Sequence, residues 1–523
     1  MTQLDTDVLV VGAGLTGMLA AAELRRHRVS CRIIDRAPGR PAHRKALGMH
    51  PRTLEIMDVI GAADEFLHRG YHANGLELHL GRRSLIVQAP RPEARFPSSV
   101  IVPPGESEAI LEARLGALGG SIERGTELLG VRQEARWVEA EVRAAGGSGR
   151  RIRSSFLIAA DGADSSVRDA VGLSFRGAGR DQATGQGMTV VHAHVRLRAA
   201  PHPCRVQAFS ARRGLGLIVP LHLDHADVAM IDLAKQQRPP TARVDLADLR
   251  DSLRAIAPGH PGLAEATRIT TIRPSCRQAS NYRAGRVFLA GDAAHIANPA
   301  SCLSSDLGLQ DAFSLAWRLA LFLRGFAPQS LLDTYDAERR RAAGRAIRAT
   351  APLMRMRAER SPELRLPGRP HLRLLPARHR AALALSGLAI GHEHRSRQWA
   401  ALRDGDQMPN LELLGPDGLP VRLYELLRHP TYALLIYAST RRLRQQPAEI
   451  AAAFRSGAVT HPHIRCYLLL SERAPQPLDS DAPVLIDING QLQREARVRH
   501  GTALLVRPDG CLAFHGRITT API

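Results

Sequence analysis

Apolar runs that end in small or acidic residues recur along the chain, and each is followed by a helix-like pattern. The first run, at 7–11, predicts a strand. Apolar residues then recur at helical spacing to about Arg26, and a second run closes at Asp35. The same order of strand, turn and helix returns at 156–173 and at 285–323. Strands that alternate with helices predict a layered α/β fold.

The pattern changes between 175 and 273, where short apolar runs alternate with turn residues. These runs predict strands at 189–199, 204–211, 214–223 and 225–234. Short alternating strands separated by turns are typical of an antiparallel sheet, so we expect a separate sheet domain over this stretch.

Strongly apolar runs return in the last part of the chain and predict a small α/β unit. They lie at 432–438, 464–470, 483–488 and 503–514. The preceding stretch, 352–394, is rich in Arg and Pro but has no polar low-complexity run, so we expect helices and a connection there. No CxxC follows Gln398, which argues against dithiol chemistry and favours a role in stability or assembly.

Length and composition fit a protein with several globular domains. The 523 residues suggest two to three domains, and 44% apolar with 23% charged residues is the balance of a chain that folds around a core. The net charge of +21 comes from arginines spread along the chain, since Lys45 and Lys235 are the only lysines. No basic block alternates with aromatic residues, so we expect a solvated arginine-rich surface and no nucleic-acid partner.

The cysteine spacing and the first residues of the sequence indicate where the protein is located and which covalent or metal cross-links it lacks. The six cysteines are widely scattered, without a pair or a His/Cys cluster at metal-ligand spacing, so we expect neither disulfides nor zinc. The sequence starts with acidic residues and a short apolar run that ends in glycines, which fits neither a signal peptide nor a membrane span. We therefore expect a cytoplasmic protein without a membrane partner.

The turn after the first predicted strand is the strongest single motif. Gly12, Gly14 and Gly17 form a GxGxxG pattern between strand and helix, and Asp35 ends the next strand. Glycines at these places allow a tight turn, close approach of the backbone to a pyrophosphate and close packing of helix on strand. The Asp35 carboxylate can accept from a ribose hydroxyl, which favours a dinucleotide such as FAD or NAD.

Two later motifs have the same position at the end of a strand. Asp161 and Gly162 end one apolar run, with Arg168 on a short helix downstream, and Gly291 and Asp292 end another before a long amphipathic helix. Each motif alone fits an ordinary strand-to-helix turn capped by an aspartate. Their order and spacing together point to a single cofactor site.

The order GxGxxG, DG with a downstream arginine, and GD before a helix resembles the FAD-dependent aromatic hydroxylases of the para-hydroxybenzoate hydroxylase class. Segments 43–57, 331–344 and 504–516 look especially like the polyketide-tailoring hydroxylases that carry a C-terminal thioredoxin-like domain. The resemblance implies an α/β fold with a Rossmann-like FAD-binding domain, an antiparallel substrate sheet and a thioredoxin-like tail. The corresponding divisions are 1–174 for the first part of the FAD-binding domain, 175–273 for the substrate sheet, 274–397 for the second part with a helical connection, and 398–523 for the tail.

The same resemblance implies which residues bind the cofactor. Gly12, Gly14 and Gly17 would hold the FAD pyrophosphate, Asp35 the adenosine ribose, and Asp292 the ribityl chain. Asp161 and Gly162 would lie near the pyrophosphate and the path of NADPH, which binds only transiently. The remaining members of the expected cofactor-binding set are Arg36, Arg44, Lys45, Gly291, Pro299 and Gly308.

The loop after Pro299 departs from the family pattern. The family has Gly-Gly-x-Gly and then an asparagine, where this sequence has Ser301, Cys302, Ser304 and Asp306. Replacing these glycines is expected to displace the backbone that presses against the flavin ring, and an aspartate would oppose negative charge on the reduced ring. A covalent link from Cys302 to the flavin is disfavoured, because a small thiol packed in a loop explains this residue.

Two more positions that touch the flavin in the family also differ. Pro104 stands in place of a glutamine, and proline has neither a side-chain amide nor a backbone donor. Lys45 stands in place of an arginine, for which Arg44 can compensate. The adenosine end of the expected site is thus intact, whereas the contacts to the redox-active ring are altered.

The leading functional prediction is FAD- and NAD(P)H-dependent hydroxylation of a large polycyclic aromatic or polyketide-derived molecule. The altered ring contacts leave open a non-oxidative cyclase or isomerase with FAD structural or absent, and a non-catalytic subunit of a biosynthetic assembly. No catalytic base can be chosen from the sequence. The sheet region carries four histidines that we expect to face solvent or core rather than to bind a metal: His192, His194, His222 and His225.

Overall fold

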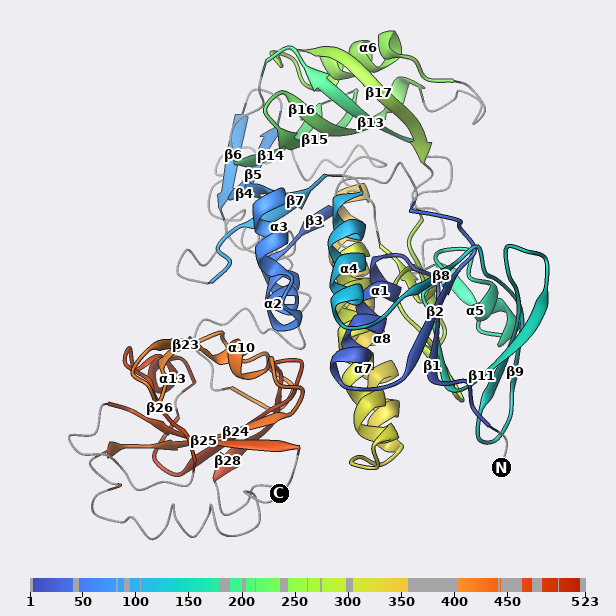
Figure 1. Ribbon diagram of the computed structural model, residues 1–523. Helices are drawn as coiled ribbons and strands as arrows, with labels where there is room; N and C mark the ends of the chain where they lie inside the picture. Colours follow the sequence, from blue (N-terminus) through green and yellow to red (C-terminus); the bar gives the residue numbers. More distant parts are fainter. Residues whose placement is uncertain are drawn as a thin grey trace. The chain divides into compact units, whose positions relative to one another are not determined.

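The fold is described from a computed structural model, in which the chain divides into two compact units. The larger unit comprises Met1–Leu54, Ala62–Ala316 and Gln329–Ile390, and the smaller comprises Glu55–Gly61, Trp317–Pro328 and Gly391–Ile523 (Figure 1). The structure describes residues 3–40, 47–80, 83–88, 95–103, 105–177, 189–199, 204–211, 213–235, 243–260, 262–272, 275–297, 304–355, 402–440, 443, 463–472, 482–496 and 498–517.

A mostly parallel sheet, with β19 (Arg283–Ala284) antiparallel at one edge, forms the centre of the larger unit. Its strand order is β19, β20 (Val287–Leu289), β11 (Gly149–Ala159), β1 (Thr6–Val11), β2 (Cys31–Asp35) and β8 (Ile122–Arg124). β9 (Glu127–Gln133) and β10 (Val138–Arg143) extend it as an antiparallel meander beside β11. Strand β1 is buried because it pairs in parallel with β11 and β2, which fits its continuous apolar run.

Helices and two small sheets surround this centre. The helices are α1 (Leu15–Arg26), α3 (Ala63–Arg69), α4 (Glu106–Ala117) and α5 (Ser166–Ala170), whereas α2 (Pro51–Ile60) begins in the larger unit and ends in the smaller. One small sheet has the order β3 (Leu47–Met49), β7 (Ser99–Val102), β4 (Tyr71–Ala73), and the other β12 (Phe175–Gly177), β18 (Arg277–Ala279), β21 (His295–Ile296). The 3-10 turns are η1 (Leu233–Lys235) and η2 (Gly291–Ala293).

A second large sheet makes up the remainder of the larger unit. Its order is β17 (Leu263–Ile272), β13 (Val190–Leu197), β16 (His225–Asp232), β15 (Gly214–His222), β14 (Arg205–Ala211), β5 (Gly75–Leu80) and β6 (Arg83–Gln88). All neighbours are antiparallel except β14 and β5. The strands expected between 189 and 234 are confirmed. The sheet also includes β5 and β6, which the sequence division at 175–273 does not contain.

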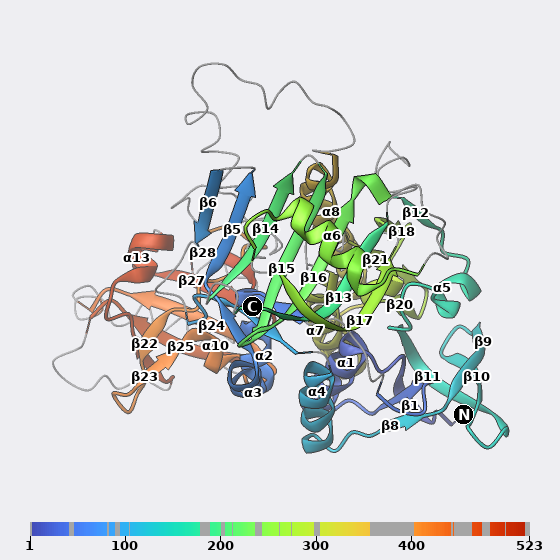
Figure 2. The same cartoon turned by 90° about the horizontal axis from the view of Figure 1, so that it is seen from above.

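Helix α6 (Leu246–Ile256) covers one face of this sheet, as Figure 2 shows. Ala193, Val195, Val228 and Ile218 point to this face and pack with Leu253 in a buried cluster. Every second residue of β13 therefore contacts the α6 side, and the residues between them lie on the opposite face.

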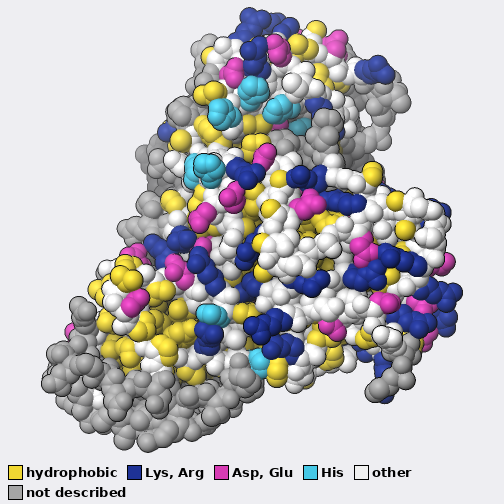
Figure 3. Space-filling view, viewed as in Figure 1, with side chains coloured by type: hydrophobic (Ala, Val, Ile, Leu, Met, Phe, Trp, Pro, Cys, Tyr) yellow, Lys and Arg dark blue, Asp and Glu magenta, His cyan; other side chains and the backbone are white. Residues whose placement is uncertain are grey.

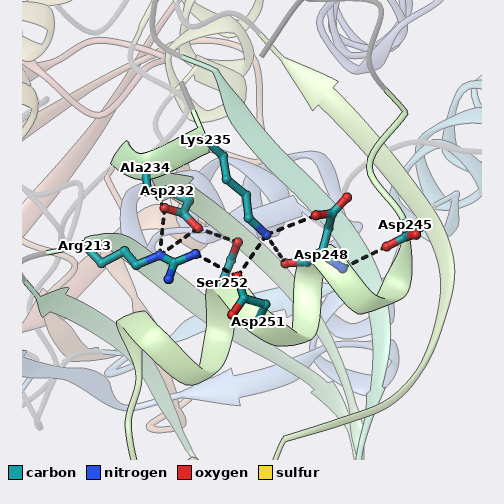
Figure 4. A network of polar contacts seen from close by, with 8 residues as sticks. All are labelled: Arg213, Asp232, Ala234, Lys235, Asp245, Asp248, Asp251 and Ser252. Carbon is teal, nitrogen blue, oxygen red and sulfur yellow. Dashed lines mark hydrogen bonds and ion pairs between the residues drawn. The ribbon is translucent and has the colours of Figure 1, made fainter. Parts of the chain in front are cut away.

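A charged network fastens α6 to the sheet (Figure 4). Asp232 accepts from Arg213 Nε at 3.2 Å and from Ser252 Oγ at 2.7 Å, so it ties β16 to the helix. Lys235 donates to the Asp248 carboxylate at 3.2 Å and pairs with Asp251 at the same distance. Burial raises the pKa of Asp232, but the hydrogen bonds from Ser252 and Arg213 outweigh that effect, so the pKa is lowered.

Two long helices follow the parallel sheet. α7 (Ser304–Leu323) is buried along nearly its whole length, which explains its apolar sequence, and α8 (Ser330–Arg355) is amphipathic. The helix predicted after Asp292 is confirmed, but it is buried along nearly its whole length and not amphipathic as expected. Among the described residues, we find no helix with the length and apolar character needed to cross a bilayer.

The smaller unit contains a mixed sheet. Its order is β23 (Pro420–Arg422), β22 (Glu412–Leu414), β26 (Val484–Ile486), β25 (Ile464–Leu470), β24 (Tyr432–Ala438), β27 (Thr502–Val506) and β28 (Leu512–Arg517), with the helices α10 (Leu423–Leu426) and α13 (Gln491–Ala496). β24, β25 and β26 are parallel, and β27 is antiparallel to β24. Trp317 belongs to this unit, where its Nε1 donates to Asp509 at 3.1 Å.

The fold class predicted from the sequence is confirmed. The chain is a mixed α/β protein with a parallel nucleotide-binding-type sheet, a largely antiparallel second sheet, and a C-terminal mixed sheet where the thioredoxin-like domain was expected. The helical connection expected at 352–397 lies almost entirely outside the described residues.

Candidate cofactor-binding site

The first two motifs pack directly against each other. Gly12 has a φ of +100°, and a Cβ there would lie 2.3 Å from the carbonyl oxygen of Ala160. A Cβ at Gly17 would lie 1.9 Å from the Gly12 carbonyl oxygen. Any side chain at either position therefore clashes with backbone, so only glycine allows the turn after β1 to approach the DG turn after β11.

The GD turn, the third motif, packs against the start of α1 at Thr16. A Cβ at Gly291 would lie 2.7 Å from Thr16 Oγ1, and one at Gly308 would lie 2.6 Å from the same atom. Gly291 also has a φ of +65°. The start of α1, the GD turn and the start of α7 therefore meet around one threonine. The structure brings together motifs that lie almost 300 positions apart in the sequence.

The N-terminus of α1 is open to an anion. Its N-cap residue, Gly14, provides no side-chain hydrogen bond, and the first turn of the helix contains no acidic residue. The first N–H groups of a helix have no intrahelical acceptor, and the helix dipole favours negative charge at this end. The first turn of α1 therefore fits a phosphate group.

Asp35 is fixed at the end of β2 by two backbone donors. Its Oδ2 accepts from Ala13 N at 2.6 Å and its Oδ1 from Ala37 N at 2.8 Å. The carboxylate is thereby held beside the GxGxxG turn, where it can still accept from a ligand hydroxyl because each oxygen has two lone pairs. Arg36 follows it and is exposed.

The DG turn contains an unpartnered buried acceptor. Asp161 Oδ2 accepts from Val167 N at 3.2 Å, whereas Oδ1 is buried without a hydrogen-bond partner among the described residues. Gly162 follows with a φ of +91°. Arg168 ties this turn to the GD turn, since it donates to the carbonyls of Ala163 at 2.9 Å and Ala293 at 3.2 Å. A buried acceptor of this kind is satisfied by a donor from a bound ligand.

A buried ionic cluster on α7 and α8 supports the GD turn. Asp311 accepts from Gly291 N at 3.1 Å, from His295 Nε2 at 2.6 Å and from Arg339 Nε at 2.7 Å. Burial raises the pKa of Asp311, but the attraction of His295 and Arg339 outweighs it and the pKa is lowered. Asp292, beside Gly291, is exposed.

Sequence reasoning did not find this cluster. Its signal was an acidic residue inside an otherwise apolar helix, since Asp311 lies among Leu307, Leu315 and other buried apolar residues. Its partners come from a turn and from α8, so the sequence alone could not pair them.

Several of the expected flavin-contact residues, including part of the altered loop, lie outside the described residues. These positions are Arg44, Lys45, Pro104, Pro299, Ser301 and Cys302. Ser304, which the structure does describe, bonds with both backbone groups of Ala297: the Ala297 N–H donates to its Oγ at 3.0 Å, and the Oγ donates to the Ala297 carbonyl at 3.3 Å. The hydroxyl that stands in place of a glycine thus holds the two ends of the loop together.

Asp306 has an unexpected partner. It is buried, and its carboxylate accepts from His50 Nδ1 and from His50 N, the latter at 3.3 Å. The negative charge that the sequence led us to place against a reduced flavin ring is therefore paired within the protein.

Comparison with known proteins defines the class. The family model described as "FAD binding domain" matches residues 5–350. The 6-methylpretetramide 4-monooxygenase of Streptomyces rimosus is 32% identical to this chain over 533 residues, which cover 98% of this chain and 90% of that protein. The solved structure of OxyS anhydrotetracycline hydroxylase from Streptomyces rimosus is 29% identical, with a TM-score of 0.72 over 99% of this chain and 96% of that one.

The chain belongs to the FAD-binding aromatic hydroxylases of the para-hydroxybenzoate hydroxylase class and is related to the polyketide-tailoring monooxygenases. It is a flavin-dependent monooxygenase-like enzyme with FAD as its cofactor. The structure of the Diels-Alderase PyrE3 in pyrroindomycin biosynthesis shares the fold with a TM-score of 0.71 over 98% of this chain and 96% of that one. Its identity of 24% makes this a likeness of fold alone.

Proposed function

We propose that the protein hydroxylates a polycyclic aromatic or polyketide-derived substrate, using FAD and a transiently bound NAD(P)H. The packing of the DG turn against Gly12, and of the GD turn against Thr16 at the start of α1, is the observation that carries this proposal. The glycines there permit a close backbone approach, the first turn of α1 is open to an anion, and Asp161 offers a buried acceptor. All three features fit FAD.

Different residues of this chain would bind different parts of FAD. Gly12, Gly14 and Gly17 would face the pyrophosphate at the start of α1, and Asp35 would accept from the adenosine ribose. Asp292 would bind the ribityl chain, and Asp161 with Gly162 would lie near the pyrophosphate. FAD, when bound, supplies hydride acceptance from NAD(P)H and activation of oxygen. The protein would position FAD and the substrate relative to each other and exclude water from the reacting groups.

The second sheet would bind the substrate on the face that α6 leaves uncovered. Partly buried apolar residues lie on this face, among them Leu215, Ala229 and Ile272, beside the buried Val190 and Ile231. A mostly apolar surface with few polar groups suits a flat, apolar ring system. The named relatives act on 6-methylpretetramide and anhydrotetracycline, which supports a polycyclic substrate here.

Oxygen-isotope labelling tests the proposal. The FAD-loaded protein is incubated with NADPH, a panel of polycyclic phenols and ¹⁸O₂, and the products are analysed by mass spectrometry. Hydroxylation adds one labelled oxygen to a product and consumes one NADPH for each. A product whose added oxygen is unlabelled, or NADPH oxidation that no substrate stimulates, would count against it.

A redox-neutral cyclase or isomerase on the same scaffold is the second candidate. It rests on Ser304 and Asp306, which replace a glycine and an asparagine of the family and are bonded to Ala297 and His50. A product with the mass of its substrate, formed equally well without NADPH and without oxygen, would favour this candidate over hydroxylation.

A further inference from the structure

Two histidines share one buried carboxylate on the second sheet. Asp227, which is only 5% exposed, pairs through Oδ1 with His194 Nδ1 at 3.0 Å and through Oδ2 with His192 Nε2 at 3.4 Å. Histidine side chains gather at the surface in this part of the molecule, as Figure 3 shows. Both imidazoles are partly exposed, with side-chain exposures of 14% for His192 and 29% for His194. A ligand can therefore reach both rings.

These three residues lie on the face opposite α6. Ala193 and Val195, which alternate with the two histidines along β13, pack in the α6 cluster, and so do Ala226 and Val228 on either side of Asp227. Successive residues of a strand point to opposite faces, so His192, His194 and Asp227 point away from α6. The register agrees, because His194 is directly opposite Asp227.

The same face of the sheet contacts the small sheet of β3, β7 and β4. Val219 is directly opposite Asp227 on the neighbouring strand β15. Val219 and Leu221 pack against Ile101 of β7 and Ala73 of β4. Two residues further along β16, Ala229 belongs to the apolar cluster described above. The two histidines therefore lie between two apolar clusters, on the face of the sheet that contacts β4 and β7.

The Asp227 carboxylate determines which imidazole nitrogen can accept a hydrogen bond from a ligand. Because Asp227 Oδ1 is hydrogen-bonded to His194 Nδ1, the neutral His194 ring carries its proton on that atom and leaves Nε2 as an acceptor. His194 thus accepts from a hydroxyl group, while His192 Nε2 lies 3.4 Å from Asp227 Oδ2. The arrangement does not suit a metal, since no group of three or more His, Cys, Asp or Glu among the described residues has metal-binding geometry. Nearby charges are His225, which stacks on His194, and Arg268, directly opposite His194 on β17.

We propose that His192, His194 and Asp227 form an acid–base site that binds and ionises an acidic phenol or enol of the substrate. This inference rests on the proposed function and specifies its substrate class. In the step, the O–H bond of the phenol breaks and the proton moves to Nε2 of His194, which leaves a phenolate beside an imidazolium paired with Asp227. No oxidant is required. A phenolate ring is more electron-rich than the phenol and so more readily attacked by an electrophilic oxygen.

Binding of 2-hydroxyanthraquinone and of its O-methyl ether tests the site. The FAD-loaded protein is titrated with each, without NADPH and without oxygen, in a buffer where the free hydroxy compound is the neutral phenol. Difference absorbance reports whether the bound ligand is phenol or phenolate. We expect a bound phenolate and an affinity at least tenfold higher than that of the ether. A bound phenol, equal affinities for the two ligands, or no binding of the hydroxy compound would overturn the proposal.

Substitutions connect the result to the named residues. His192→Gln and His194→Gln are each expected to lose about tenfold in affinity for the hydroxy compound while keeping their affinity for the ether. Asp227→Asn keeps a side chain of the same size and is expected to lose the phenolate spectrum. His222→Gln, on the exposed end of β15, is the matched control and should behave like the wild type. Unchanged phenolate binding in both histidine variants would contradict the assignment.

The design separates this inference from hydroxylation itself. The titration needs neither NADPH nor oxygen, so phenolate binding can succeed where labelling with ¹⁸O₂ fails. If both histidine variants lose the ether as well, their fold is impaired, and the wild-type comparison of phenol with ether decides alone.

Discussion

Asp306 at the start of α7 accepts a hydrogen bond from His50, a residue 256 positions earlier in the chain. Both side chains are buried, with exposures of 8% for His50 and 1% for Asp306. The family pattern has an asparagine at this position. The charge that this substitution adds therefore has a partner inside the protein, which is why it need not place a free anion against the cofactor.

Removing either partner of this pair should have unequal effects. His50→Gln leaves a buried carboxylate without an ionisable partner, and we expect it to lower the free energy of unfolding by about 3–5 kcal/mol. Asp306→Asn keeps a hydrogen-bond acceptor without the charge and should cost about 1–2 kcal/mol. Urea unfolding of both variants measures this difference. A larger loss for Asp306→Asn than for His50→Gln would contradict the pairing.

Gly12→Ala should abolish tight FAD binding. The new Cβ would lie 2.3 Å from the Ala160 carbonyl oxygen, on a residue whose φ is +100°. We expect FAD affinity to fall more than tenfold and stability to fall by about 1–3 kcal/mol. Gly116→Ala is the matched control, because Gly116 is exposed in α4 with nothing within 4 Å of a Cβ and should be neutral or stabilised by up to about 1 kcal/mol. Equal FAD affinity in the two variants would contradict the account of the turn.

Arg339→Met should destabilise the larger unit strongly. Arg339 is 1% exposed and binds Asp311, so its loss leaves that buried carboxylate with His295 as its remaining charged partner. We expect a loss of about 3–5 kcal/mol in the free energy of unfolding. Arg340→Met removes the neighbouring arginine, which is exposed and pairs with Asp336 at 3.6 Å, and should change stability by less than about 1 kcal/mol. Denaturant unfolding compares the two, and similar losses would refute a special role for Arg339.

Asp311 should make stability sensitive to acid. Its pKa is lowered in the folded state, so its contribution is present above the unfolded carboxyl pKa of about 3.9 and is lost as the pH falls through the folded value. The difference in free energy of unfolding between wild type and Asp311→Asn should therefore be constant above about pH 5 and should shrink below about pH 4. Urea unfolding between pH 3 and pH 7 measures it. A difference that grows on acidification would contradict the lowered pKa.

Local patterns in the sequence were sufficient to predict the elements that carry the cofactor motifs. The apolar run before Gly12, the run that ends at Asp161 and the helix predicted after Asp292 appear in the structure as β1, β11 and α7. Strands and helices of this kind follow from periodicity of neighbouring residues, which is local information. The order of these motifs then led to the resemblance to a known family, which supplied the expected roles of the residues.

Contacts between distant segments could not be predicted in this way. Pairing of His50 with Asp306, and of Arg339 with Asp311, depends on how loops and helices pack, and no spacing rule links such positions. The second sheet gives a further example, because β5 joins it beside β14 through a parallel pairing that no alternation pattern specifies. The sequence indicated that the histidines lie on strands. It could not indicate that Asp227 lies between His192 and His194, because this depends on the register of β13 and β16.

The central claim is that this chain uses FAD as a redox cofactor despite the residues at 301–306. The most direct test is an anaerobic titration of the FAD-loaded protein with NADPH, with and without a polycyclic phenol, followed by visible absorbance. We predict that the flavin bands bleach with one equivalent of NADPH, faster when the phenol is present, and return on admission of air. A bound flavin that NADPH leaves oxidised even with the phenol present would contradict the claim and leave redox-neutral chemistry on this scaffold.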